Sequence, residues 1–138
     1  MGSLLDFLTD HPITEVTKEV KISSRFKDAK GNILPFKIRA MSGVEYSEYL
    51  KQSQRMNSKE KVTGFDYNKY QGLIVIGNTI EPCFKDVEAI KKAGCLTAEQ
   101  FLYKSLLIGE IINLADEITD LSGFNIDLET LREEAKNA

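Results

Sequence analysis

The sequence has no tryptophan, one histidine, two cysteines and three prolines among 138 residues. A structural zinc site takes three or four closely spaced Cys and His ligands, so we expect no metal and no cofactor. The single histidine, His11, gives no support to a Ser-His-Asp or Cys-His catalytic site. Gly72 and Gly77 lie in an apolar helical pattern rather than in a phosphate-binding loop. We therefore expect no enzyme, with Cys83 and Cys95 as reduced thiols.

Long apolar runs and an excess of positive charge are also lacking. No apolar run approaches the ~20 residues of a membrane-spanning helix, and no secretory signal is recognisable near Leu4–Leu8. Lysine and arginine together number 18 against 21 aspartates and glutamates, a net charge of −3, which argues against a globally basic nucleic-acid-binding protein. The expectation is a protein of the cytoplasm with no membrane partner.

The charges that are present divide the chain into parts of opposite sign. Residues 1–17 hold three acids and no base, residues 18–61 eleven bases and five acids, and residues 62–138 seven bases and thirteen acids. Two explanations stay open at this point. The basic and acidic parts attract each other within one fold, or the basic part meets an anionic partner.

Alternating apolar residues predict a β-hairpin over residues 18–41. The apolar positions are mostly even-numbered on both sides of a turn at 28–32, which contains Gly31 and Asn32. Folding about Lys30 pairs Val20 with Ala40 and places all even-numbered positions on one face. The other face is then basic, and its cations are Lys21, Arg25, Lys27, Lys37 and Arg39. Lys21 would lie opposite Arg39, an unfavourable pair that calls for acidic groups nearby.

The rest of the sequence shows helical periodicity interrupted by capping residues. Ser42 with Glu45, and Thr97 with Gln100, are typical of capping boxes. Asp66 and Asp86 are expected to cap two further helices, and Asp127 a final one with a thin apolar stripe. The clearest amphipathic pattern runs from Glu110 to Leu121 and ends at Gly123.

These elements predict a single domain over residues 1–138 of the α+β class, mainly α, in which an N-terminal basic β-hairpin is followed by about five or six helices. Its expected parts are a flexible lead over 1–17, the β-hairpin over 18–41, a helix over 42–57, a linker over 58–65 and an acidic helical part over 66–138.

The basic face of the hairpin raises the question of whether the protein binds nucleic acid. The basic face of the hairpin could meet nucleic acid, but Phe26 and Phe36 point to the apolar face, so base-stacking rings do not alternate with the cations there. The acidic helical part would repel a polyanion. Nucleic acid is therefore the weaker alternative, and the remaining interpretation is a helical interaction protein.

Several motifs along the chain resemble one known family. They are VKISSRFKDAKGN at 20–32, FKIRA at 36–40, Pro82 with Phe84 and Asp86, Gly109-Glu110, Leu121 to Phe124, and Phe7-Leu8 in the lead. In order and spacing this is similar to the phage tail assembly chaperones of the PBSX-like prophage type, the XkdN-like family.

The resemblance implies a non-enzymatic protein that acts during phage morphogenesis in the bacterial cytoplasm. It implies that the tape measure protein, a long helical client, is bound and kept soluble while the tail tube forms, and that the chaperone does not remain in the mature virion. Related chaperones often have a short form and a frameshifted longer form. Another phage tail structural or connector protein stays open as the alternative, to be distinguished by its presence in purified particles.

The expected partner-binding surface lies in the last part of the chain. A helical client needs apolar grooves or exposed apolar side chains. The apolar pattern of 110–121 exceeds what the thin final helix can cover. The residues expected to contact a client, or a second copy of the chain, are Leu121, Phe124, Ile126, Leu128 and Leu131.

Overall fold

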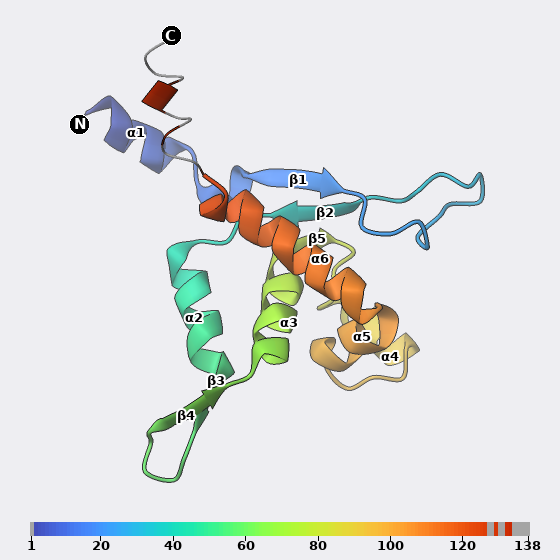
Figure 1. Ribbon diagram of the computed structural model, residues 1–138. Coiled ribbons are helices and arrows are strands. Elements are labelled where there is room, and N and C mark those ends of the chain that lie inside the picture. The colour runs from blue at the N-terminus through green and yellow to red at the C-terminus, as the bar shows by residue number, and fades with distance from the viewer. Residues whose placement is uncertain (1, 127–128, 130–131, 134–138) are drawn as a thin grey trace.

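The protein was analysed as a computed structural model, in which residues 2–126, 129 and 132–133 are described. It has the predicted α+β class, mainly α, with short antiparallel strands and six α-helices among the described residues. Strands β1 (Thr17–Val20), β2 (Phe36–Arg39) and β5 (Thr79–Glu81) form a sheet in the order β1-β2-β5. Helix α6 (Ile108–Thr119) crosses in front of this sheet and of α3 (Tyr67–Asn78) (Figure 1).

The predicted hairpin exists, but its strands are shorter than predicted, and the register predicted for their pairing in the sheet is wrong. Val20 lies opposite Phe36 rather than Ala40, and Thr17 rather than Lys21 lies opposite Arg39. The shift between the strands is an even number of residues, so the faces are unchanged. Val20, Phe36, Ile38 and Ala40 are all buried, as predicted.

The predicted register holds only at the tip of the hairpin. The Leu34 N–H donates to the Phe26 carbonyl at 2.8 Å, and Lys27 forms a bridge with Ile33. Between the tip and the sheet, residues 21–25 of the first strand have only Pro35 as their counterpart on the second. Proline has no N–H, so it cannot continue the hydrogen bonds between the strands. The surplus residues leave the sheet there. The sheet register also places Glu19 opposite Lys37, in place of the predicted pair of like charges.

Four predicted helix starts are accurate because their caps are formed, whereas the helix predicted to start at Asp127 lies outside the described residues. Ser42 and Glu45 make a reciprocal capping box at α2 (Gly43–Ser53). Asp66 caps α3 by accepting the Lys69 N–H, and Asp86 caps α4 (Val87–Lys92). Thr97 caps α5 (Ala98–Ser105), but the Gln100 side chain accepts from Leu96 rather than from Thr97, so this box is only half formed.

Segment 58–65, expected to be a linker, is instead part of a second hairpin. Strand β3 (Gln54–Met56) pairs with β4 (Val62–Phe65), and the Asn57 side chain accepts the N–H groups of Lys59 and Lys61 in the turn. Helix α2 therefore ends at Ser53 and not near residue 57. In Figure 1 this hairpin projects from the end of α2 and α3 that lies away from the sheet.

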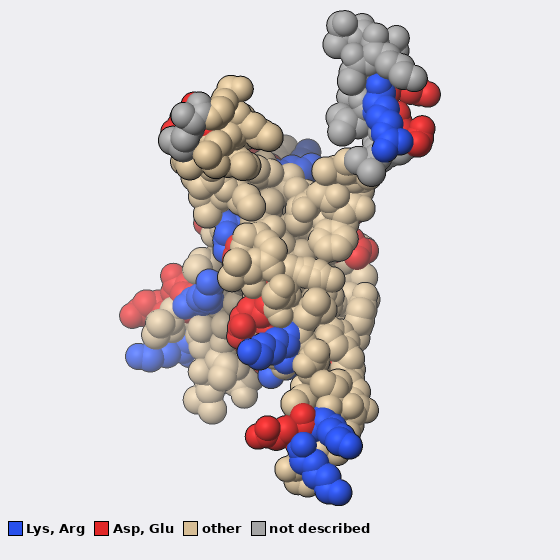
Figure 2. Space-filling view, turned by 90° about the vertical axis from the view of Figure 1, so that its left-hand side faces the viewer, with Lys and Arg blue, Asp and Glu red and all other residues tan. Residues whose placement is uncertain are grey.

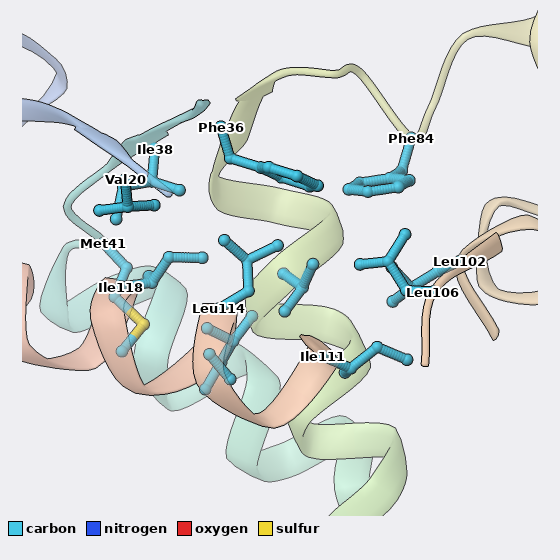
Figure 3. Packing of buried hydrophobic residues seen from close by; sticks show 13 residues of the cluster. Val20, Phe36, Ile38, Met41, Phe84, Leu102, Leu106, Ile111, Leu114 and Ile118 are labelled. Carbon is cyan, nitrogen blue, oxygen red and sulfur yellow. The ribbon is translucent and has the colours of Figure 1, made fainter. Parts of the chain in front are cut away.

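The core lies between the sheet and the helices and joins both halves of the chain. Figure 3 shows Val20, Phe36 and Ile38 of the hairpin facing Ile111, Leu114 and Ile118 of α6. Leu102 and Leu106 of the α5 region complete one side of this cluster with Phe84. The best amphipathic pattern in the sequence thus closes the core.

Two glycines in α3 allow close approach of tyrosines. A Cβ at Gly72 would lie 2.9 Å from the Tyr103 hydroxyl, and one at Gly77 would overlap the hydroxyl of Tyr49. Tyr49 accepts a hydrogen bond at 3.2 Å from the buried Asn78 side chain. These glycines serve packing, in agreement with their assignment to a helical pattern.

Residues 2–16, part of the segment predicted to be a flexible lead, precede the sheet and include a helix. Helix α1 (Ser3–Asp10) is followed by a 3-10 turn (Ile13–Glu15). No described side chain of α1 is buried. The segment is held to the sheet where the Ala40 N–H donates to the Val16 carbonyl at 2.9 Å.

Candidate interaction surfaces

Five aromatic rings from four elements touch one another on one side of the helices. They are Tyr46 of α2, Phe65 of β4, Tyr67 and Tyr70 of α3, and Phe124, and together they are called the aromatic surface. Phe124 stacks on Tyr46 with ring centroids 5.4 Å apart, and Tyr46 contacts Tyr70 at 6.3 Å. Phe65 meets Tyr70 at 5.5 Å. The rings form one chain of contacts.

Much of the aromatic surface is open to solvent. Phe124 is 59% exposed, Tyr67 61% and Phe65 40%. The neighbouring Ile126 is exposed, and the hairpin that carries Phe65 also exposes the cross-strand pair Met56 and Val62. Figure 2 shows uncharged side chains over much of the face above the charged tip of this hairpin, beside one group of charged side chains near the centre of the view. Contiguous apolar surface of this kind is typical of protein-binding sites.

The hydroxyl of Tyr70, in the middle of this surface, is neutral at physiological pH. Burial raises the pKa of Tyr70 to about 12, and the adjacent Tyr46 hydroxyl acts in the same direction. Tyrosine rings combine a large apolar area with a hydroxyl that finds a hydrogen-bond partner in an interface. The arrangement is therefore suited to the apolar face of a protein partner.

Phe124 reaches Tyr46 because α6 ends in a tight, anchored turn. Thr119 is followed by a π-helical turn (Asp120–Phe124) in which Gly123 has a φ of 101°. Only glycine adopts this left-handed conformation readily. Ser122 fixes the turn, since its hydroxyl donates to the Ile118 carbonyl at 2.7 Å and accepts the Met41 N–H at 3.0 Å.

The structure places three of the five residues expected to bind a partner. Phe124 and Ile126 are exposed, whereas Leu121 is half-buried and packs against the core. Leu128 and Leu131 lie outside the described residues. The sequence-based hypothesis did not include the rings of α2, β4 and α3, because Tyr46 and Tyr70 fit an ordinary core stripe and Phe65 stood in the expected linker.

Of the five cations predicted for the basic face of the hairpin, Arg39 and Arg25 pair with acidic groups of the fold itself. Arg39 is half-buried and binds Glu45 at 2.6 Å and the Gly77 carbonyl at 3.0 Å. Arg25 turns toward α6. Lys21, Lys27 and Lys37 are exposed. The attraction between basic and acidic parts is thus exerted within the fold, and Lys18 adds a contact with Glu117 at 3.3 Å.

Arg25 and Glu110 join the hairpin to the start of α6. Arg25 donates to both carboxylate oxygens of Glu110, at 2.7 and 3.1 Å, and to the Ser105 carbonyl at 3.0 Å. Glu110 also accepts the Leu107 N–H at 2.8 Å. The Arg25 guanidinium lowers the pKa of the Glu110 carboxyl from an ordinary value of 4.5 to about 2, with the Leu107 N–H contributing, against the opposing effect of burial.

We expect Glu110→Gln to destabilise the fold by about 1–3 kcal/mol at pH 7, because a hydrogen-bonded charge pair is lost. The depressed pKa means that the wild-type stabilisation is present above pH 4.5 and disappears as the pH falls toward 2. Urea unfolding at pH 7 and pH 3 measures the difference. A gap between wild type and variant that is as wide at pH 3 as at pH 7 would contradict the ion pair.

An apolar groove of about 360 Å³ lies beneath the loop that connects β1 to β2. Its walls come from the loop, from the turn after β5, and from the α5 region, and they comprise Phe26, Leu34, Pro35, Phe36, Glu81, Pro82, Phe84, Phe101, Ser105 and Leu106. Leu34 is 48% exposed at its edge. The volume falls within the range of about 300–1,000 Å³ seen for binding pockets.

No group of three or more His, Cys, Asp and Glu side chains among the described residues has the arrangement of a metal site. No helix in this part of the chain is long and apolar enough to cross a membrane. Cys83 and Cys95 are free thiols.

Known proteins resemble this chain over most of its length. The model of the family described as phage XkdN-like tail assembly chaperone protein matches residues 4–136. The phage-like element PBSX protein XkdN of Bacillus subtilis (strain 168) is 33% identical over 125 residues, covering 86% of this chain and 83% of that protein. Protein YqbN of the same strain is 28% identical over 135 residues, covering 95% and 91%.

A solved structure shares the fold. The crystal structure of the protein YqbN superposes with a TM-score of 0.68 at 24% sequence identity and covers 91% of this chain and 99% of that one. The small sheet with helices on it is therefore an architecture that another protein also adopts.

Proposed function

Because this chain belongs to the XkdN-like phage tail assembly chaperone family, whose role is non-enzymatic, we propose that it binds a tape measure protein and keeps it soluble during tail assembly. The site of action is the cytoplasm of the bacterial host. The chaperone leaves before the virion is mature. The family relationship is the premise, and the identity of the client is the proposal.

The aromatic surface is the observation that carries this proposal. Phe124, Tyr46, Tyr70, Phe65 and Tyr67 form a continuous apolar area that extends over the helices and the β3–β4 hairpin. A tape measure protein that is not yet enclosed by the tube exposes apolar faces of its helices. An amphipathic helix binds through anchor residues at helical spacing, and rigid rings accept such anchors at low entropic cost.

The proposed mechanism consists of reversible binding to the client and involves no catalysed reaction. Each chaperone covers one apolar stretch of the client and so prevents contact between client molecules. When the tail tube subunits enclose the client, they compete for the same faces and displace the chaperone. Reversible contact through exposed rings suits this exchange better than a deep buried interface would.

Co-purification tests the proposal directly. The tagged chain, co-expressed with the tape measure protein of the same phage, is expected to carry that protein through affinity and size-exclusion steps. Purified phage particles are expected to lack the chain. Its presence in particles at a fixed stoichiometry would instead support a structural or connector protein of the tail.

Removal of residues 127–138 is expected to leave the fold intact and to lower the yield of soluble tape measure protein. The core contacts of α6 and the anchored turn at Ser122 lie before this segment, whereas Leu128 and Leu131 lie within it. Circular dichroism melts and the soluble client yield are measured on the same preparations. Unchanged client yield with a stable fold would remove these two leucines from the binding surface.

A further inference from the structure

The β3–β4 hairpin has an apolar face that continues the aromatic surface. Met56 lies opposite Val62, Gln54 lies opposite Phe65, and a bulge between these pairs gives β4 one extra residue. Met56, Val62 and Phe65 therefore share one face, and Arg55 lies on the other. Met56 and Val62 are 53% and 57% exposed. Because a two-stranded hairpin is only marginally stable by itself, a partner that covers this face would also stabilise the hairpin.

The turn of the hairpin presents lysine side chains that the fold itself does not use. The Asn57 side chain accepts the backbone N–H groups of Lys59 and Lys61, so the main chain holds the turn. Within the part of the chain that the structure describes, no ion pair joins either lysine to a carboxylate. The hairpin contains Arg55, Lys59 and Lys61 as its bases and Glu60 as its single acid. The charged tip seen in Figure 2 is thus basic on balance and can receive an anionic group.

The opposite end of the aromatic surface has acidic neighbours. Phe124 stacks on Tyr46 in the first turn of α2, whereas the hairpin begins directly after Ser53 in the last turn of that helix. Asp116 and Asp120 are exposed at the end of α6 and in the turn that leads to Phe124. Figure 1 likewise shows the end of α6 and the hairpin at opposite ends of α2. The surface therefore has an acidic end and a basic end.

This polarity matches one direction of a bound helix. The eleven residues of α2 span about 16 Å, or about three helical turns, so the surface has room for several anchors at helical spacing. A helix has partial positive charge at its N-terminus and unsatisfied carbonyl groups with partial negative charge at its C-terminus. Lysines favour the C-terminal end and carboxylates the N-terminal end. Both ends of the surface thus favour the same direction.

We propose that the aromatic surface takes an amphipathic client helix in one direction, with its C-terminal turn at the tip of the β3–β4 hairpin. Lys59 and Lys61 bind acidic side chains and the last carbonyl groups of that turn, and Met56 and Val62 contact its apolar residues. The segment recognised is then an apolar helix face followed by Asp or Glu. This inference rests on the proposed function, because it describes the segment of the client that the surface selects.

Three stapled helical peptides with identical leucine spacing test the direction. The first carries glutamates in its last turn, the second carries lysines there, and the third carries glutamates in its first turn. The staple, placed on the polar face, keeps their helix content alike. Fluorescence anisotropy with the full chain at low salt is expected to show the first peptide binding about tenfold more tightly than the other two. The difference is expected to shrink as salt screens the exposed charges.

A charge reversal at the tip tests the two lysines. Lys59→Glu with Lys61→Glu is expected to reverse the preference between the first and second peptides. Lys59→Ala with Lys61→Ala is expected to abolish that preference, and it decides the question if the first variant does not fold. Lys27→Glu with Lys30→Glu makes the same change in net charge at exposed positions of the β1–β2 loop, and this control is expected to keep the wild-type order.

The results separate this inference from the proposed function. Equal affinities for the three peptides, no binding of any of them to wild type, or an unchanged preference in the tip variants would overturn the inference. If wild type still co-purifies with the tape measure protein in that case, the proposed function stands. A wild type that prefers the first peptide and recovers no tape measure protein would support the direction of binding and contradict the proposed client.

Discussion

Ile38→Lys is expected to bring the domain close to loss of its fold. Ile38 is 0% exposed and lies on β2, the middle strand between β1 and β5, and it belongs to the buried core. A lysine there either buries a charge or opens the core to water, at a cost of about 4 kcal/mol or more. Domains of this kind have about 5–15 kcal/mol of stability in all. Urea unfolding monitored by circular dichroism measures the loss.

Two charge reversals on the same hairpin provide the comparison. Lys21→Glu is expected to be nearly neutral, because Lys21 is exposed and lies beyond the paired strand residues. Lys37→Glu is expected to cost about 0.2–1 kcal/mol, because Glu19 and Glu81 lie opposite it in the sheet. Equal losses in all three variants would contradict the observed register and faces.

A variant with both Phe124→Asp and Tyr67→Asp is expected to lose the tape measure protein while retaining its fold. Both side chains are more than half exposed, at 59% and 61%, so little core contact is lost. Two charges on the aromatic surface would have to be desolvated on binding to an apolar helix face, and that cost opposes complex formation. Affinity co-purification and a melt of the free variant are measured together.

Val87→Asp is the matched control for this experiment. Val87 is 62% exposed on α4 and is not part of the aromatic surface. It tests whether any added surface charge reduces client recovery. Equal recovery with the double variant and with wild type would show that the client binds elsewhere on the chain.

Local signals in the sequence were sufficient for helix starts and for the faces of the hairpin. The side chains of Ser42, Asp66 and Asp86 cap helices where short-range chemistry requires it. The alternation of Val20, Phe36 and Ile38 predicts the buried face whatever the exact register, because an even shift preserves it. These features depend on neighbours within a few residues.

Features that depend on distant partners were missed. Strand β5 has three residues, Thr79–Glu81, and exists because β2 is available to pair with it. Likewise, Arg25 leaves the hairpin because Glu110, far along the chain, binds it through two hydrogen bonds. The polar residues from 57 to 61 indicated a linker, although the Asn57 side chain makes them a hairpin turn.

Only part of the candidate site was predicted, because its remaining residues come from elements that are distant in the sequence. Phe124 and Ile126 were selected as apolar residues after an amphipathic helix, and they are exposed. Their ring neighbours Tyr46 and Tyr70 come from two other helices, and such proximity is not encoded in spacing along one element. The sequence did contain one signal for this site, which is the group of aromatic residues that begins at Phe65, directly after a polar segment that contains glycine.

The central claim is that this chain keeps a tape measure protein soluble, and the soluble fraction of that protein measures it. The tape measure protein is co-expressed either with the full-length chain or, at matched level, with an unrelated acidic protein, and the lysate is separated by ultracentrifugation. The account predicts that the tape measure protein stays mostly in the supernatant with the chain and mostly sediments without it. The same distribution in both lysates would contradict the account.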